Sequence, residues 1–276
     1  MSQAPAGRAA VLGKPIAHSL SPVLHQAAYD ALELDWSYEA VECDEDELEP
    51  FLGSLGPSWR GLSLTMPLKQ AVLHLLDDVE QLARDVEAAN TVVLERGRRR
   101  GFNTDVPAFV AALAEAGVER VGFASVLGGG ATARSALAAL ARLGVMEPVV
   151  YLRRLELEGR MKQTAERLGQ RLSVLPWEIA EEAMVADLVI STVPAGATDQ
   201  LALRVPKAPG VLFDVVYSPW PTVLARHWSD LGGRVVGGFE LLLHQAALQV
   251  DLMTGRSAPL AAMREAGEAA LATRRR

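Results

Sequence analysis

The feature that most constrains the fold is a glycine-rich segment near the middle of the chain. An apolar run over residues 121–127 predicts a buried strand, three glycines follow it, and residues 133–143 have the pattern of a helix. Gly128, Gly130 and Ala133 match the spacing G-x-G-x-x-G/A, which combines a tight turn, close approach to a pyrophosphate and close helix–sheet packing. Free N–H groups at such a helix start bind phosphate. The segment predicts a Rossmann-like dinucleotide site; a glycine-rich turn without a ligand is the alternative.

The end of the next predicted strand, residues 149–152, indicates which dinucleotide binds. An acidic residue at this point binds the ribose 2′-hydroxyl of NAD, but this chain has Arg153 and Arg154. Two guanidinium groups suit the 2′-phosphate of NADP, because each forms paired hydrogen bonds with phosphate oxygens. Glu156 and Glu158 come later and are expected to face solvent. NADP is therefore predicted over NAD, and an arginine pair that only faces solvent would leave the choice open.

Apolar runs alternate with helical patterns on both sides of this segment, which predicts an α/β protein with a mostly parallel sheet. We expect a substrate-binding and catalytic domain over residues 1–106, to which C-terminal helices in residues 239–276 return. A Rossmann-like NADP-binding domain is expected over residues 107–238. The further predicted strands are residues 9–12, 38–41, 62–64, 91–94, 188–192 and 211–216, and helices are predicted to start at Ser21-Pro22, Met66-Pro67 and Ala108.

Composition excludes several classes of function. The chain of 276 residues has 27 basic and 34 acidic side chains, and its net charge of −7 disfavours binding to a nucleic acid backbone. It contains no run of about 18 apolar residues, so no membrane span is expected. The start of the chain lacks the basic and apolar stretches of a signal peptide, and Cys43 is the only cysteine. These observations predict a cytoplasmic protein that acts on small molecules.

Polar residues gather where four loops should meet the edge of the first sheet. In open α/β sheets ligands bind outside the carboxyl ends of the strands, and these hydroxyl, amide, amino and carboxylate groups suit a sugar-like ligand with several hydroxyls. Each segment has an ordinary structural alternative: Ser21 as a helix cap, Asn90 and Asn103 as turn residues, and Lys69 as a solvated lysine. The four segments are residues 18–21, 65–69, 90–91 and 103–105.

Lys69 and Asp105 form the candidate catalytic pair. Reduction of a ketone needs a hydride and a proton. A lysine can supply the proton, and a neighbouring carboxylate can orient it and bind a substrate hydroxyl. The sequence does not establish that the two side chains meet.

Together these segments resemble the shikimate dehydrogenase family. The similarity runs from about residue 9 to residue 262, with the motifs in the order that the family has. It implies reversible NADPH-dependent reduction of 3-dehydroshikimate to shikimate, without a metal, in the chorismate pathway of aromatic amino-acid biosynthesis. The motifs are residues 13–22, 61–69, 89–91, 101–105, 153–154, 187–194, 214–219 and 237–245.

The resemblance also implies roles for individual residues. Lys69 would be the acid/base residue, with Asp105 as its partner. The substrate would be held by Ser19, Ser21, Ser63, Thr65, Asn90, Asp105, Tyr217 and Gln245. The NADP cofactor would be held by Gly128, Gly129, Gly130, Ala131, Thr132, Ala133, Arg153, Arg154, Thr192, Val193, Val215 and Gly238.

Three positions depart from the family's pattern. Ser63 stands where the family usually has Asn, Ala131 where it has a second adjacent glycine, and Glu240 where a small residue is common. These departures keep two alternatives open: a paralogue that acts on quinate or another ring acid, and a cofactor-binding protein without turnover. Beyond its small-molecule substrate we expect no nucleic acid or membrane partner, and a monomer or homodimer.

Overall fold

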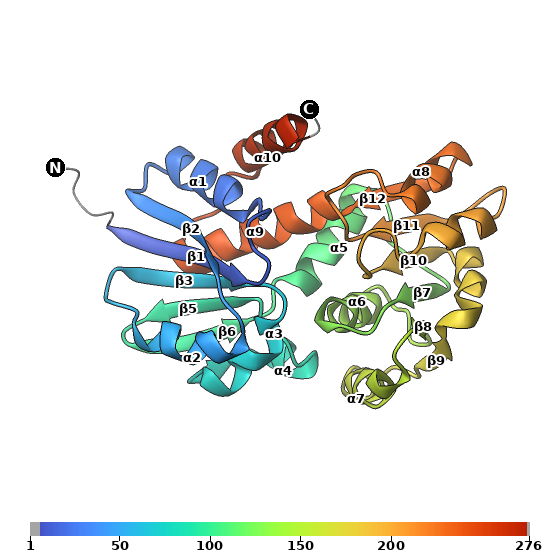
Figure 1. Cartoon of the computed structure of the whole chain (residues 1–276), viewed down its shortest axis with the longest axis horizontal. Coiled ribbons are helices and arrows are strands. Elements are labelled where there is room, and N and C mark those ends of the chain that lie inside the picture. Colours follow the sequence, from blue (N-terminus) through green and yellow to red (C-terminus); the bar gives the residue numbers. More distant parts are fainter. Residues whose placement is uncertain (1–5, 275–276) are drawn as a thin grey trace. The chain divides into compact units, whose positions relative to one another are not determined.

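The computed structural model describes residues 6–274, so residues 1–5 of the N-terminal segment and the last two residues lie outside it. The chain forms two compact units. Unit 1 comprises Met1–Thr104 and Leu242–Arg276, and unit 2 comprises Asp105–Leu241. Colours in Figure 1 follow the chain through both units. No helix among the described residues has the length and apolar character needed to cross a membrane.

Unit 1 contains a six-stranded sheet in the order β2-β1-β3-β5-β6-β4. β1 pairs in parallel with β2 and β3, β4 pairs in parallel with β6, and β5 runs antiparallel to both of its neighbours. All four strands predicted in this region lie within observed strands. The strands are β1 (Gly7–Gly13), β2 (Trp36–Glu42), β3 (Trp59–Leu64), β4 (Asp78–Val79), β5 (Thr91–Glu95) and β6 (Arg98–Phe102).

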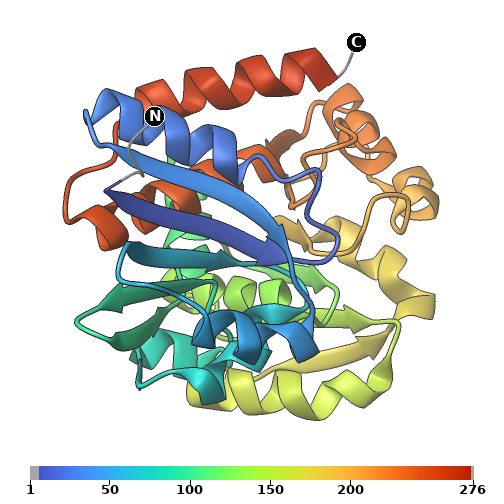
Figure 2. The ribbon, with the colours of Figure 1, turned by 60° about the vertical axis from the view of Figure 1, so that its left-hand side comes forward.

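Helices cover the sheet of unit 1. Helix α1 buries Leu24 and Ala28 and lies beside α10, as both ribbon views show (Figures 1 and 2). Leu48 of α2 and Leu68 of α3 join the apolar cluster formed with β1 and β3. Because β1 is covered in this way, residues 9–12 are all buried and apolar, as expected for a central strand. The helices are α1 (Ser21–Ala31), α2 (Glu45–Gly53), α3 (Leu68–Ala71), α4 (Gln81–Asp85), α9 (Gly238–Thr254, in unit 1 from Leu242) and α10 (Leu260–Arg274).

The helix predicted to start at Met66 is shorter than the apolar pattern indicates. Helix α3 begins at Leu68 and continues only as a 3-10 turn, η1 (Val72–Leu75). A residue before proline is disfavoured in helical backbone, so Pro67 excludes Met66 from the helix. The amide of Leu68 donates instead to the carbonyl of Thr65 in a turn.

Unit 2 is a doubly wound domain whose six strands are all parallel, in the order β12-β11-β10-β7-β8-β9. The strand order reverses at β7, which is the switch point where such sheets bind ligands. Its strands are β7 (Ala124–Leu127), β8 (Val149–Leu152), β9 (Ser173–Pro176), β10 (Leu188–Ser191), β11 (Val211–Asp214) and β12 (Arg234–Gly237). Its helices and 3-10 turns are α5 (Asp105–Glu115), α6 (Ala131–Arg142), η2 (Leu155–Leu157), α7 (Glu158–Arg167), η3 (Trp177–Val185), η4 (Asp199–Arg204) and α8 (Val223–Asp230).

Strand β7 starts three residues later than the apolar run predicts. The backbone N–H of Phe123 donates to the side-chain carboxylate of Asp187 at 2.9 Å, and residues 122–123 form a bend. The chain therefore enters the sheet only at Ala124.

Candidate functional site

The glycine loop connects β7 to α6 and has the geometry that its sequence predicts. Gly128 has a φ of +115°, and a Cβ there would lie 2.5 Å from Oγ1 of Thr192, so a side chain would be both strained and obstructed. Gly130 occupies the N-cap position of α6, and a Cβ there would meet nothing within 4 Å. Ala133, in the first turn of α6, is fully buried. The loop therefore leaves open space at the helix start, where a pyrophosphate would bind the N–H groups.

Residues after β10 lie directly against this loop. The backbone N–H and the hydroxyl of Thr192 both donate to the carbonyl of Leu127, each at 2.9 Å. Val193 is close enough that a Cβ on Gly128 would lie 3.2 Å from its Cγ1. The structure thus brings Thr192 and Val193 together with the glycine loop at the switch point of the sheet.

The two arginines follow β8 and are both exposed. The guanidinium carbon of Arg153 lies 5.6 Å from the ring centroid of Trp177, within the range of a cation–π contact. Arg154 lies 3.8 Å from the carboxylate of Glu156. An exposed ion pair of this kind contributes little to stability, so it imposes little cost on a rearrangement around phosphate. Glu156 is exposed, as expected, whereas Glu158 is only partly exposed at the start of α7.

Val215 and Gly238 are neighbours in unit 2. The amide of Val215 donates to Ser191, the amide of Gly238 donates to the carbonyl of Val216, and a Cβ on Gly238 would collide with the carbonyl of Val215. This close approach of the two backbone segments requires glycine at position 238. It places Gly238 next to Val215, which follows β11. Tyr217 follows in the same loop and is half-buried.

Asp214 anchors the loop that carries Tyr217. Its carboxylate accepts hydrogen bonds from the Thr222 hydroxyl at 2.7 Å and from the amide of Val216 at 3.2 Å. Burial raises the pKa of this carboxyl, and the hydrogen bonds oppose the shift. No role was predicted for Asp214 from the sequence, although it lies in one of the family motifs. Its position as an acidic residue at the end of an apolar strand is the signal that could have identified it.

The segment before α1 holds Ser19 and Ser21 in a fixed turn. The Ser19 hydroxyl accepts the amide of Ser21 at 3.2 Å, and the N-cap residue of α1 is Leu20 without a side-chain cap. Ser21 therefore does not have the alternative role of a helix cap. Arg274 of α10 donates to the carbonyls of His18 and Ser19 at 2.7 and 3.3 Å.

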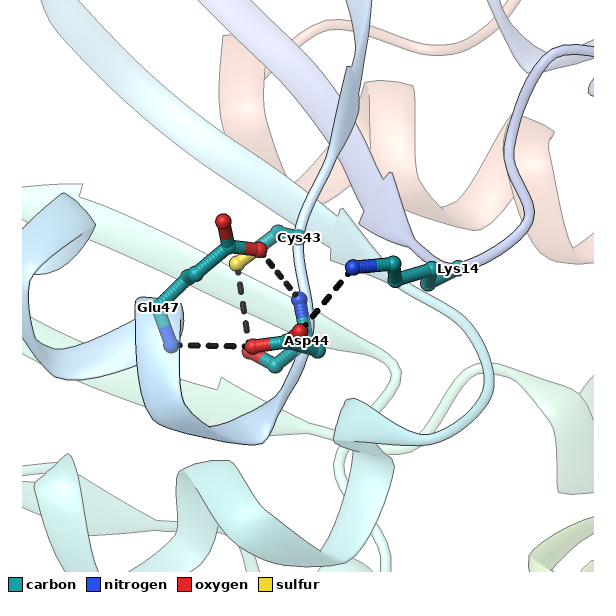
Figure 3. A network of polar contacts seen from close by, with 4 residues as sticks. All are labelled: Lys14, Cys43, Asp44 and Glu47. Atoms are coloured by element: carbon teal, nitrogen blue, oxygen red, sulfur yellow. Dashed lines mark hydrogen bonds and ion pairs between the residues drawn. The ribbon is translucent and has the colours of Figure 1, made fainter.

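The start of the same segment is tied to α2. Lys14 Nζ lies 3.0 Å from the carboxylate of Asp44, and Asp44 forms a capping box with Glu47 at the start of α2 (Figure 3). The hydrogen bond between them raises the pKa of Lys14 and lowers that of Asp44. The Cys43 thiol is directed to the carbonyl of Asp44. Lys14 thus connects the loop of residues 13–20 to a capped helix.

Asn90 and Gln245 are brought together in unit 1. The Asn90 Oδ1 accepts the amide of Thr104 at 2.8 Å, and its Nδ2 donates to Gln245 Oε1 at 3.4 Å. Lys69 is half-buried on α3, and its carbonyl accepts the amide of Ala89 at 2.8 Å. The predicted residues Asn90, Gln245 and Lys69 therefore belong to adjoining segments, and Asn90 does not behave as a simple turn residue.

Ser63 and Thr65 leave β3 close to these residues. The Ser63 hydroxyl is buried and lies 2.6 Å from Tyr38 Oη and 2.7 Å from Gln249 Oε1. Thr65 is half-buried, and its amide donates to Leu12. Tyr38 and Gln249 are polar partners that the sequence did not single out.

The proposed catalytic pair belongs to two units. Lys69 lies in unit 1, whereas Asp105 is buried and is the first residue of α5 in unit 2. Asp105, Tyr217 and all the predicted cofactor residues lie in unit 2, and the other predicted substrate residues lie in unit 1. The pairing of Lys69 with Asp105 remains a prediction.

Comparison with known proteins gives the family. Residues 11–92 match the family model of the shikimate dehydrogenase substrate binding domain, and residues 238–266 match that of the shikimate 5′-dehydrogenase C-terminal domain. Shikimate dehydrogenase (NADP(+)) of Thermus thermophilus is 38% identical over 268 residues, which cover 96% of this chain and 98% of the relative. The chain belongs to the shikimate dehydrogenase family. This finding confirms the predicted family.

Solved structures of the family have the same architecture. The Mycobacterium tuberculosis shikimate dehydrogenase has a TM-score of 0.87 at 40% identity, and the match covers 95% of this chain and 99% of that one. The Thermus thermophilus enzyme in complex with NADP(H) and shikimate has a TM-score of 0.85 at 36% identity, covering 96% and 99%. The predicted fold class, a substrate domain plus a Rossmann-like NADP-binding domain, is confirmed. A quinate dehydrogenase of Corynebacterium glutamicum in complex with NAD is also similar, with a TM-score of 0.87 at 25% identity over 96% of this chain and 99% of that one.

Proposed function

We propose that this chain catalyses the reversible NADPH-dependent reduction of 3-dehydroshikimate to shikimate. The observation that carries the proposal is the similarity over nearly the whole chain to relatives named for shikimate and NADP(+). Unit 2 fits the cofactor: its glycine loop is open at Gly130, and Arg153 and Arg154 follow β8. The two arginines favour NADP over NAD because they match a 2′-phosphate.

Residues of this chain perform the proton transfers of the reaction. Bound NADPH supplies the hydride that reduces the ketone carbon. Lys69 donates the proton that the ketone oxygen takes up as its double bond is reduced, and the neutral amine then regains a proton from solvent. Asp105 orients the Lys69 ammonium and accepts a hydrogen bond from a ring hydroxyl. In the reverse direction, Lys69 accepts the hydroxyl proton.

The remaining polar residues hold the ring. Asn90 and Gln245 bind ring hydroxyls through their amides, which are already directed to each other in unit 1. Ser19, Ser21, Thr65 and Tyr217 bind the carboxylate and the other hydroxyls of the ring. Such fixed donors orient the carbonyl for hydride transfer. This positioning lowers the activation barrier, because much of the entropic cost of aligning the reactants is met on binding.

The test is a spectrophotometric assay of nicotinamide reduction with shikimate and with quinate, each offered NADP and NAD. We expect the fastest turnover with shikimate and NADP. The absence of turnover with every pair would refute the dehydrogenase and favour a cofactor-binding protein. Faster turnover with quinate would replace the substrate by that of the alternative paralogue.

The role of Lys69 is tested by Lys69→Ala, with the exposed Lys207→Ala as the matched control. The first substitution is expected to lower kcat by about a hundredfold or more with little change in the KM for shikimate, since it removes proton transfer rather than binding. Lys207→Ala should leave both constants unchanged. An unaltered kcat in Lys69→Ala would remove this residue from the mechanism.

We also propose that the protein works in the cytoplasm as a monomer or homodimer. The single cysteine, Cys43, is buried and suits a reducing compartment, and the net charge of −7 disfavours nucleic acid as a partner. Light scattering coupled to size-exclusion chromatography measures the oligomeric state, and a mass above that of a dimer would contradict this part of the proposal.

A further inference from the structure

Five side chains of unit 1 form a buried hydrogen-bonded chain that ends at Asn90. Tyr38 comes from β2, Ser63 from β3, Gln249 from α9 and Thr91 from β5, and their exposed fractions are 7%, 3%, 0% and 0%. Asn90 itself is 1% exposed. Burying so many polar groups is costly unless each is hydrogen-bonded, so the arrangement needs an explanation.

The contacts that form this hydrogen-bonded chain are short and continuous. Tyr38 Oη lies 2.6 Å from Ser63 Oγ, and Ser63 Oγ lies 2.7 Å from Gln249 Oε1. Gln249 Nε2 lies 3.2 Å from the carbonyl oxygen of Asn90 and 3.0 Å from Thr91 Oγ1. Thr91 Oγ1 lies 2.9 Å from Asn90 Oδ1. The Gln249 side chain therefore contacts Asn90 directly, at the backbone carbonyl of Asn90, and indirectly, through the hydroxyl of Thr91.

The backbone carbonyl of Asn90 determines the direction of the hydrogen bonds that connect Gln249, Ser63 and Tyr38. A carbonyl can only accept, so the NH₂ group of Gln249 faces it and the Gln249 oxygen faces Ser63. The Ser63 hydroxyl must then donate to Gln249, and it accepts the proton of Tyr38. One backbone group thus determines the orientation of three side chains.

The amide of Thr104 fixes the other end. A backbone N–H can only donate, so the Asn90 oxygen faces it at 2.8 Å, and the Thr91 hydroxyl donates to the same oxygen. The Asn90 NH₂ group is consequently turned to Thr104 Oγ1 at 2.9 Å and to Gln245 Oε1 at 3.4 Å. A flipped Asn90 would place its NH₂ against the N–H of Thr104 and lose these bonds.

We propose that Gln249, Ser63 and Tyr38 are positioning residues that hold the Asn90 amide with its NH₂ group turned to Gln245 and the ring hydroxyls of the substrate. The inference rests on the proposed function, because Asn90 and Gln245 bind the ring there. Ser63 then acts through Gln249 instead of touching the ring. Its proton is used by Gln249, and the Tyr38 hydroxyl occupies one of its lone pairs.

The hydrogen-bonded chain is also connected to the segment that contains Ser21. The ring of Tyr38 stacks on His25 with centroids 3.9 Å apart and an interplanar angle of 16°. His25 Nδ1 in turn lies 2.9 Å from the carbonyl of Ser21, to which it must donate. The phenol of Tyr38 is therefore held by a ring that is itself fixed to the start of α1.

The test compares variants that remove a link of the hydrogen-bonded chain with one variant that keeps every link. Gln249→Leu and Ser63→Ala remove links, and Thr91→Val removes a hydroxyl at constant shape, whereas Thr91→Ser keeps it. Each broken link is expected to raise the KM for shikimate about three- to tenfold, the effect of one neutral hydrogen bond, with the KM for NADP unchanged. Thr91→Ser should stay near the wild-type value. Gln170→Leu in unit 2 is the matched control: it removes buried glutamine bonds to Leu137 and Val145 and should lower Tm without changing the KM for shikimate.

Two kinetic outcomes would overturn the proposal. If Ser63→Ala raises the KM for shikimate while Gln249→Leu and Thr91→Val do not, Ser63 contacts the ring directly. If every folded variant keeps the wild-type KM, the buried chain only supports the fold. Should Gln249→Leu fail to fold, Thr91→Val against Thr91→Ser carries the same comparison.

A second measurement does not depend on turnover. Exchange of the Asn90 side-chain NH₂ protons with solvent, followed by ¹H–¹⁵N spectra, is expected to be slow in the wild type and faster in Ser63→Ala and Thr91→Val. Unchanged exchange in both variants would refute the positioning role. A wild type without dehydrogenase activity would refute the proposed function instead, and the exchange experiment would still decide the orientation of Asn90.

Discussion

A buried histidine should make the stability of unit 1 depend on pH in a specific window. His25 is fully buried in α1, and burial lowers its pKa from 6.5 to about 4, although the bond to the Ser21 carbonyl opposes the shift. The unfolded chain therefore takes up a proton at a higher pH than the folded chain. The contribution of neutral His25 is present above pH 6.5 and is lost as the pH falls toward 4.

The magnitude follows from the two pKa values. With 6.5 in the unfolded chain and about 4 in the folded chain, the loss in the free energy of unfolding is about 2 kcal/mol between pH 7 and pH 5, and about 3 kcal/mol by pH 4. His25→Gln has no group that titrates in this window. It should be less stable than the wild type at pH 7, because it loses the stack on Tyr38, and its stability should fall less steeply below pH 6.5.

The assay is urea unfolding at pH 7, 6 and 5 for the wild type, His25→Gln and the control His74→Gln, whose histidine is exposed. Comparison at each pH cancels the groups that the proteins share. The difference between wild type and His25→Gln should shrink by about 2 kcal/mol from pH 7 to pH 5, and that between wild type and His74→Gln should stay constant. Parallel pH profiles for wild type and His25→Gln would refute the reasoning.

Three further predictions concern unit 2. Gly128→Ala should lower stability by about 1–3 kcal/mol in thermal unfolding, because its φ is +115° and the methyl group meets Thr192, whereas Gly130→Ala should keep the wild-type Tm but weaken NADP binding in a titration. Arg153→Ala combined with Arg154→Ala should raise the KM for NADP at least about tenfold and leave that for NAD unchanged, since only NADP carries the 2′-phosphate; equal effects on both cofactors would contradict the cofactor assignment. Gly238→Ala should lower Tm in the same thermal assay, because its Cβ would overlap the carbonyl of Val215; an unchanged Tm would show that the loop shifts at no cost.

The parts that could be predicted from the sequence are those whose physics is local. Strand, glycine turn and helix follow one another within residues 121–143, and each leaves its own pattern, so the sequence predicts the loop and the positions where its turn requires glycine. Strand β6 was missed because Arg98-Arg99-Arg100 has no apolar alternation. It forms because Arg96 and Gly97 both adopt positive φ, 51° and 76°, and close a tight hairpin with β5.

The hydrogen-bonded chain behind Asn90 could not be predicted, because its links are separated by up to 186 residues. One signal was nevertheless present. Gln249 is a polar residue within the apolar stretch of residues 246–250, and it lies four residues after Gln245, on the same face of a helix. A glutamine on a buried face needs partners, so its position indicated a polar cluster without identifying its members.

The role of Ser63 changes once these partners are known. A serine in place of the family's usual asparagine lacks an amide that could reach a substrate hydroxyl. In this chain a second amide, that of Gln249, accepts the Ser63 proton and donates to Asn90 and Thr91. The orientation of Asn90 then depends on Ser63 and Gln249 together. Replacing Ser63 by the family's asparagine should therefore disturb substrate binding unless Gln249 changes with it, because the longer side chain would compete for the space and the hydrogen bonds that Gln249 uses.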